Sequence, residues 1–167
     1  TVMSNAGLDV AIEAAGGRTV RTPVGDKHVI DEMLKGGYNF GGEQSGHLIF
    51  SDHASTGDGL VAALQILRIM AARQKSLSEL AQCWTRFPQK LTNLRVTEKK
   101  PIEELADVPG LVAEAEAALQ AEGGRVLLRY SGTEPKIRLL VEGRDATALD
   151  AWSEKIIGAI AGQIGEK

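Results

Sequence analysis

The stretch RVLLRYSGTEPKIRLLVE, residues 125–142, decides the fold of the second half of the chain. Two apolar runs, Arg125–Tyr130 and Lys136–Glu142, flank the polar turn Ser131–Pro135. Runs of Val, Ile and Leu bounded by Ser, Gly, Thr and Pro are typical of a β-hairpin or of two neighbouring strands. The pattern therefore predicts two strands joined by a short turn.

The same turn carries groups that bind phosphate. Arg129 precedes it, Arg138 follows it, and the turn itself contains Ser131, Gly132 and Thr133. Guanidinium groups pair with phosphate oxygens, hydroxyls donate hydrogen bonds, and glycine lets the backbone approach an anion closely. We predict that these five residues bind a phosphate. The alternative is an ordinary hairpin turn, which has the same composition.

Residues 87–167 are predicted to form one domain around this hairpin. Residues 88–96 have an extended pattern. A helix is predicted over 111–122, and another begins at the capping residue Asp145, because apolar residues recur there every three or four positions. The order strand, helix, strand, strand, helix predicts an α+β domain in which an antiparallel sheet carries helices on one face.

Residues 1–86 are predicted to form an α/β domain, because strands and helices alternate along them. We place the boundary near Thr85–Pro88, where the composition changes. The helix expected over Leu60–Arg73 has apolar residues on several faces, which predicts burial on more than one side. The other expected elements are helices over 5–15 (capped by Ser4 or Asn5), 28–35 (capped by Asp26) and 76–84, and strands over 18–22, 39–42 and 48–50.

A second polar stretch, Gly41–His47, has the composition of a sugar-binding loop. With the period of two that strand residues follow, Glu43, Ser45 and His47 point the same way. A carboxylate accepts hydrogen bonds from two hydroxyls, and a serine both donates and accepts, so this set suits the vicinal hydroxyls of a sugar. The alternative is a glycine-rich hairpin whose polar residues face water.

A third polar stretch, residues 52–59, immediately precedes the apolar helix. Asp52, His53 and Asp58 suggest a metal site, whereas Asp58 or Thr56 is suited to cap that helix. We favour the cap. The three histidines show no metal-ligand spacing with the only cysteine, Cys83.

The composition argues against several classes of protein. The chain has 167 residues, of which 43% are hydrophobic and 25% charged, as in ordinary globular proteins. A net charge of −3 without a basic stripe argues against a nucleic-acid partner, and no apolar run approaches the roughly 18 residues of a membrane helix. A single cysteine suits a reducing, cytoplasmic location. Because Thr1–Met3 looks like the end of a strand, we expect the chain to be part of a longer protein.

Together these stretches resemble the α-D-phosphohexomutase superfamily and, within it, the bacterial phosphoglucosamine mutases. The Glu-Gln-Ser-Gly-His sequence of residues 43–47 is the specific part, because related phosphomannomutase/phosphoglucomutases more often resemble Met at the position of Gln44. The matching stretches follow the family's order and cover nearly the whole chain. They are Thr1–Asn5 with Gly7 and Leu8, Val24–Asp26, Gly42–His47, Thr56–Gly59, and Arg129 with Ser131–Pro135 and Arg138.

The resemblance implies a four-domain enzyme of which this chain is the C-terminal part. Residues 1–86 then correspond to most of domain three, an α/β three-layer domain that recognises the sugar and is N-terminally truncated here. Residues 87–167 correspond to domain four, a phosphate-binding α+β domain with a TATA-binding-protein-like fold. The implied partners are a phosphosugar and the missing N-terminal domains of the same protein, with no nucleic acid and no membrane.

The resemblance also implies the reaction. Such enzymes are isomerases of amino-sugar and cell-wall precursor metabolism. They interconvert glucosamine 6-phosphate and glucosamine 1-phosphate through a bisphosphate intermediate. A phosphoserine transfers the phosphoryl group and an Asp-rich loop binds Mg²⁺, and this sequence resembles neither loop. We therefore expect no catalytic residue and no metal ligand in this chain, and no mutase activity from it alone.

Site residues are carried over by position. Glu43 and Ser45 resemble the family's sugar-hydroxyl ligands, and His47 is expected to support the same loop. Tyr130 stands where the glucosamine enzymes usually resemble Pro. The alternatives are a fragment of a phosphomannomutase/phosphoglucomutase and a phosphosugar-binding module without chemistry. The residues that resemble the family's phosphate clamp are Arg129, Ser131, Gly132, Thr133 and Arg138.

Overall fold

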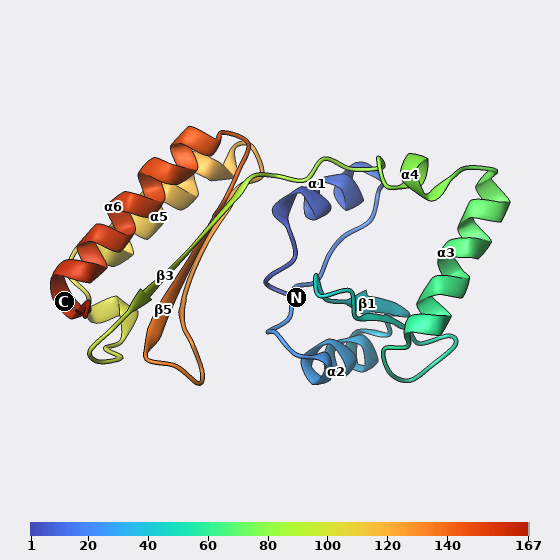
Figure 1. Ribbon diagram of the computed structural model, residues 1–167, viewed down its shortest axis with the longest axis horizontal. Coiled ribbons are helices and arrows are strands. Elements are labelled where there is room, and N and C mark those ends of the chain that lie inside the picture. Colours follow the sequence, from blue (N-terminus) through green and yellow to red (C-terminus); the bar gives the residue numbers. More distant parts are fainter. Residues whose placement is uncertain (167) are drawn as a thin grey trace. The chain divides into compact units, whose positions relative to one another are not determined.

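The computed structural model describes residues 1–166, which form two compact units, Thr1–Thr85 and the residues from Arg86 onward (Figure 1). The first unit combines helices with a two-stranded antiparallel ladder, and the second packs helices on a three-stranded sheet. The predicted fold class, α/β followed by α+β, is confirmed. No helix among the described residues is long and apolar enough to cross a membrane.

The second unit is built on the predicted hairpin. Strands β4 (Arg125–Tyr130) and β5 (Lys136–Glu142) pair antiparallel, and β3 (Gln89–Arg95) pairs with the other edge of β5. The sheet order is therefore β3-β5-β4. Two helices, α5 (Val108–Gln120) and α6 (Ala146–Ile164), lie on one face of this sheet (Figure 1), and a short 3-10 helix, η1 (Ile102–Glu104), precedes α5.

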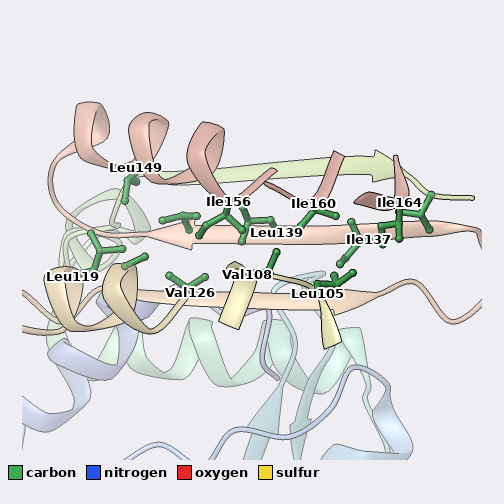
Figure 2. Packing of buried hydrophobic residues seen from close by; sticks show 13 residues of the cluster. Leu105, Val108, Leu119, Val126, Ile137, Leu139, Leu149, Ile156, Ile160 and Ile164 are labelled. Atoms are coloured by element: carbon green, nitrogen blue, oxygen red, sulfur yellow. The ribbon is translucent and has the colours of Figure 1, made fainter. Parts of the chain in front are cut away.

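The core of this unit lies between the sheet and the two helices. Ile137, Leu139 and Val141 alternate along β5 and are completely buried. Ile156 and Ile160 of α6 are equally buried and point toward β5 (Figure 2). Each such side chain contributes roughly 1.5–3 kcal/mol when it leaves water. The stripe predicted on the last helix is therefore the face that closes the core.

Helix α5 begins three residues earlier than predicted. Asp107 adopts a left-handed backbone with φ of 62° and directs the chain into the helix. Pro109 then falls in the first turn, where a missing N–H breaks no helical hydrogen bond. Proline and Gly110 hide this start in the sequence because both usually interrupt helices.

The first unit contains four helices and the ladder. Strand β1 (Phe40–Gly42) pairs antiparallel with β2 (Leu48–Phe50), and α2 (Asp26–Gly36) packs on the ladder around a small buried cluster. The cluster consists of Val29, Met33 and Ile49. The other helices are α1 (Ala6–Ala14), α3 (Gly59–Arg73) and α4 (Leu77–Leu80).

The predicted caps Asn5, Asp58 and Asp145 are confirmed, the last by a hydrogen bond that the Asp145 side chain accepts from the N–H of Thr147 at the start of α6. The Asn5 side chain accepts from the N–H of Gly7, and the Asp58 side chain accepts from two amides at the start of α3. Ser76 and Glu79 form a reciprocal capping box at α4. Asp26 is different: Gly25 is the N-cap of α2, without a side-chain cap, and Asp26 is the first helical residue.

The predicted strand over 18–22 is wrong. Within residues 1–166, no strand includes this segment. The Arg21 side chain instead pairs with Asp9 and donates to the carbonyl oxygen of Ser4 at 2.8 Å, and Thr22 accepts a single main-chain bond from Val2. Side-chain contacts to α1 and to the preceding turn, rather than a ladder, hold the segment in place.

The predicted burial of the apolar helix is also wrong. Leu60, Leu64 and Leu67 of α3 are 79%, 63% and 57% exposed. The main neighbours of this 15-residue helix are β2 and α4, which have three and four residues. Elements that short cannot cover four turns of helix, so one apolar face of α3 meets solvent in the described chain.

A buried charge closes the second unit at the end of β5. The Glu142 side chain is completely buried, and its register partners across the two neighbouring strands are Gln89 and Arg125. Gln89 donates to one carboxylate oxygen, and the Arg125 Nε donates to the other. Both oxygens are thus satisfied, as a buried carboxylate requires.

Replacing Arg125 tests this pairing. Arg125→Met leaves Glu142 buried without its cation, so we expect the free energy of unfolding to fall by about 3 kcal/mol. Lys90→Met is the control, because Lys90 forms an exposed pair with Asp150 and should cost less than about 1 kcal/mol. Urea unfolding followed by Trp152 fluorescence in a Trp84→Phe background reports on the second unit. Equal losses in the two variants would contradict the assignment.

Candidate functional site

The loop between β1 and β2 is a tight five-residue connection, Glu43–His47. Its ends are joined by a 2.9 Å hydrogen bond from the Glu43 N–H to the His47 carbonyl oxygen. The Gly46 N–H donates to the Glu43 carbonyl oxygen at 3.1 Å. Gly46 has a φ of +92°, which side chains disfavour and glycine adopts without strain. The glycine therefore lets the loop close on itself.

Both ends of this loop are attached to the start of α2. The Gly25 N–H donates to Glu43 Oε1 at 2.9 Å, and His47 Nδ1 lies 2.6 Å from Asp26 Oδ2. One carboxylate oxygen of Glu43 is therefore occupied by the protein. The other, Oε2, accepts no hydrogen bond within residues 1–166 and can accept from a ligand hydroxyl.

A third stretch meets the same histidine. The ring of His47 lies against Gly57, where a Cβ would come within 2.2 Å of ring atoms Cδ2 and Nε2. Gly57 belongs to the connection that ends on the α3 cap Asp58. His47 thus joins three polar stretches that the sequence separates: the start of α2, the loop itself and the start of α3.

The three residues predicted to bind a sugar, Glu43, Ser45 and His47, are arranged differently from the prediction. They lie in a turn, not along a strand, so the period of two does not apply. Glu43 and His47 both bind at α2, whereas Ser45 is exposed at the tip of the loop and forms no hydrogen bond with either of them in the described chain. The tip is accessible for binding.

The second polar loop, Ser131–Pro135, connects β4 to β5. It is closed by a 2.8 Å bond from the Ser131 N–H to the Lys136 carbonyl oxygen. Gly132 and Thr133 are exposed, and a Cβ at Gly132 would meet nothing within 4 Å. The backbone of this turn is therefore open to a ligand, as a phosphate site requires.

Two arginines lie side by side next to this loop. Arg129 and Arg138 are direct cross-strand partners in the β4–β5 ladder. Arg138 Nη2 lies 3.4 Å from Ser131 Oγ and 3.1 Å from Glu134 Oε2, while its buried Nε has no partner in the described residues. Like charges opposite each other are unfavourable in a ladder. The pair, with a donor left unsatisfied, favours a bound anion.

Two lysines at this loop escaped sequence analysis. Lys136 pairs with Glu134 Oε1 at 2.7 Å, and its place beside the turn is a signal that could have identified it. Lys99 donates to the Ser131 carbonyl oxygen at 2.6 Å from 32 residues away, and no local pattern indicates this contact. The Tyr130 hydroxyl donates to the Lys100 carbonyl oxygen at 2.7 Å, so the same segment braces the loop at a second point.

The third polar stretch serves the fold. Asp58 caps α3, and Asp52 Oδ2 accepts from the Asn39 side chain at 2.9 Å. No group of three or more His, Cys, Asp or Glu residues suited to a metal occurs in the part of the chain that the structure describes. The residues present therefore do not fit a magnesium site.

The chain thus folds as an α/β unit followed by an α+β unit, and each unit carries one polar loop. The family model for phosphoglucomutase/phosphomannomutase, alpha/beta/alpha domain III, matches residues 1–87, and the model for the C-terminal domain of the same enzymes matches residues 91–159. The chain belongs to the phosphoglucomutase/phosphomannomutase family.

Curated relatives are more specific in name. Phosphoglucosamine mutase of Geobacter metallireducens is 52% identical over the whole chain, which covers 37% of that protein. Phosphoglucosamine mutase of Anaeromyxobacter dehalogenans is 53% identical over 99% of the chain and 36% of its own length. The chain therefore spans a little over a third of the length of these relatives.

Solved structures share the fold at low identity. An N-acetylphosphoglucosamine mutase of Aspergillus fumigatus aligns over 96% of this chain and 37% of its own, with a TM-score of 0.78 and 19% identity. A Burkholderia thailandensis protein of the phosphoglucomutase/phosphomannomutase family aligns over 99% of this chain and 38% of its own, with a TM-score of 0.68 and 21% identity.

Gly57→Ala tests the contact between the His47 ring and the α3 connection. The added Cβ would overlap the ring, so we expect a loss of about 1–3 kcal/mol in the stability of the first unit and shifted amide resonances over Glu43–His47. Gly59→Ala is the matched control, because a Cβ at Gly59 meets nothing within 4 Å. NMR spectra and urea unfolding measure both effects. Equal behaviour of the two variants would refute the contact.

The charge pairing at the Ser131–Pro135 loop predicts a pH dependence. Hydrogen bonding and charge attraction from Lys136, with a smaller contribution from Arg138, lower the pKa of Glu134 below its ordinary value of 4.5. The pairing therefore persists above that value and is lost as the pH falls through the lowered pKa. In an NMR titration, Lys136→Met should raise the Glu134 midpoint, and Lys155→Met on α6 should not. An unchanged midpoint in Lys136→Met would contradict this account.

Proposed function

We propose that this chain is the substrate-recognising part of a phosphoglucosamine mutase, an isomerase that interconverts glucosamine 6-phosphate and glucosamine 1-phosphate. The observation that carries the proposal is the Arg129–Arg138 pair beside buried Ser131 and the exposed Gly132–Thr133 backbone, with the buried Nε of Arg138 lacking a partner within the described residues. The names of the curated relatives support the amino sugar as substrate.

The two loops divide the work of recognition. The Arg129 and Arg138 guanidinium groups, the Ser131 and Thr133 hydroxyls and the Gly132 backbone hold one phosphate of the substrate. Glu43 Oε2 and the Ser45 hydroxyl bind sugar hydroxyls, and His47 supports their loop. Because the phosphate residues recognise charge and the sugar residues recognise hydroxyl positions, one set of residues serves a bisphosphate bound in either direction.

Phosphoryl transfer belongs to the part of the protein outside this chain. In the proposal, a phosphoserine there exchanges the phosphoryl group with the bound sugar. Magnesium would also be held there, since the described residues offer no acidic cluster for it. A related A. fumigatus enzyme has been solved with GlcNAc-6P and magnesium. We expect no turnover from the 167-residue chain alone, and we place the intact enzyme in the cytoplasm, where phosphosugars are metabolised.

A second candidate concerns the sugar. The family description names glucose and mannose enzymes, so a phosphoglucomutase or phosphomannomutase activity is the competing assignment. Binding of glucosamine 6-phosphate in competition with glucose 6-phosphate and mannose 6-phosphate separates the two, because all three share the phosphate and differ only at C2 of the sugar.

Removing one guanidinium tests the phosphate assignment. NMR titration with glucosamine 6-phosphate should first perturb the amides of Ser131–Thr133. Arg138→Met should weaken binding roughly ten- to a hundredfold, because it removes the free energy of one set of charge-assisted hydrogen bonds. Arg68→Met, on exposed α3, removes the same charge and should leave the dissociation constant unchanged. A response confined to residues outside both loops would overturn the site assignment.

A further inference from the structure

The sugar loop is held in place by residues that do not belong to it. Its two ends bind neighbouring residues of the α2 start, Gly25 and Asp26. We propose that Asp26 is a positioning residue: it orients the His47 imidazole, and through it the whole Glu43–His47 loop, for binding a phosphosugar. This inference rests on the proposed function and extends it, because Asp26 was expected only to cap a helix.

The geometry fixes the state of the imidazole. Asp26 Oδ2 lies 2.6 Å from His47 Nδ1, and an ionised carboxylate can only accept hydrogen bonds. The Nδ1 atom must therefore carry a proton. In the neutral ring this leaves Nε2 as an acceptor, so the carboxylate selects one of the two tautomers. A hydrogen-bond partner on one ring nitrogen commonly decides in this way whether the other nitrogen donates or accepts a hydrogen bond.

The ring is also held on its opposite edge. Its Cδ2 and Nε2 atoms lie so close to Gly57 that a Cβ there would overlap them. The carboxylate on one edge and the glycine on the other leave the ring little freedom to rotate. The His47 carbonyl oxygen in turn binds the Glu43 N–H at 2.9 Å, so the orientation of His47 is passed to the other end of the loop.

A role limited to helix stability accounts less well for these contacts. An acidic residue in the first turn stabilises a helix through its dipole, with or without a histidine nearby. The Asp26 carboxylate instead pairs with a side chain of the loop. The next acid on α2, Asp31, pairs with exposed Lys27. The side chains of Asp26 and His47 remain 37% and 42% exposed, so the pair borders solvent where a ligand can reach it.

The experiment compares Asp26→Ala, His47→Ala and the double variant with Asp31→Asn as control, all in the 167-residue chain. Imidazole ¹⁵N NMR should find the Nδ1–H tautomer of His47 in the unsubstituted chain and in Asp31→Asn, and lose it in Asp26→Ala. Glucosamine 6-phosphate should bind about tenfold more weakly to Asp26→Ala. In the His47→Ala background, adding Asp26→Ala should raise the dissociation constant by less than about twofold. Asp26→Asn, which keeps an acceptor oxygen, should recover part of the affinity.

Two results would overturn the inference. One is that Asp26→Ala keeps the Nδ1–H tautomer of His47 and binds the phosphosugar as tightly as Asp31→Asn does. The other is an equal loss of affinity on replacing Asp26 with and without His47, which would mean that Asp26 does not act through the ring. Failure of the unsubstituted chain to bind the phosphosugar would refute the proposed function and the loop's binding role, and the tautomer comparison would still decide whether Asp26 orients His47.

Discussion

The antiparallel pairing of β4 with β5 is the constraint on which the second unit depends. It places Arg125 opposite Glu142 at one end of the hairpin and Arg129 opposite Arg138 at the other. At the end far from the loop the charges are complementary and Glu142 is buried, whereas at the loop end the charges are alike and only partly buried. A slip of one residue would turn the arginines toward the helices and the apolar face outward. The hydrophobic core therefore fixes the register, and the register places the two arginines of the proposed phosphate site opposite each other.

The first unit holds its loop by other means. Its buried cluster of Val29, Met33 and Ile49 is small, and the ladder has only three residues in each strand. Such a core cannot dictate the shape of a five-residue loop. Polar contacts to α2 and the close packing of His47 on Gly57 supply the missing restraint. Under the proposed function, recognition of a sugar there depends on hydrogen-bond geometry, while recognition of a phosphate in the second unit depends on strand register.

Local signals in the sequence predicted much of this fold and little of its long-range contact. Alternation and turn composition identified the hairpin, and capping residues identified the starts of α1, α3 and α6, because those interactions join residues close in sequence. The contacts of Asp26 with His47 and of Lys99 with Ser131 join residues far apart and leave no periodic trace. The burial predicted for α3 was wrong for a related reason: an apolar face shows what a helix can bury, not what lies against it.

Under the proposed function, the two loops recognise different parts of the substrate: the loop of the second unit binds a phosphate, and the loop of the first unit binds sugar hydroxyls. Charge attraction to a phosphate acts in every direction and is strong, so a cluster containing Arg129 and Arg138 accepts whichever phosphate of a bisphosphate is presented to it. Hydrogen bonds to hydroxyls are weaker and directional, so they discriminate between sugars only if their partners are held still. The polar contacts that attach both ends of the Glu43–His47 loop to the start of α2 meet that requirement. A phosphate anchor tolerates small displacements of its ligand, whereas hydrogen bonds from sugar hydroxyls to Glu43 Oε2 and Ser45 do not.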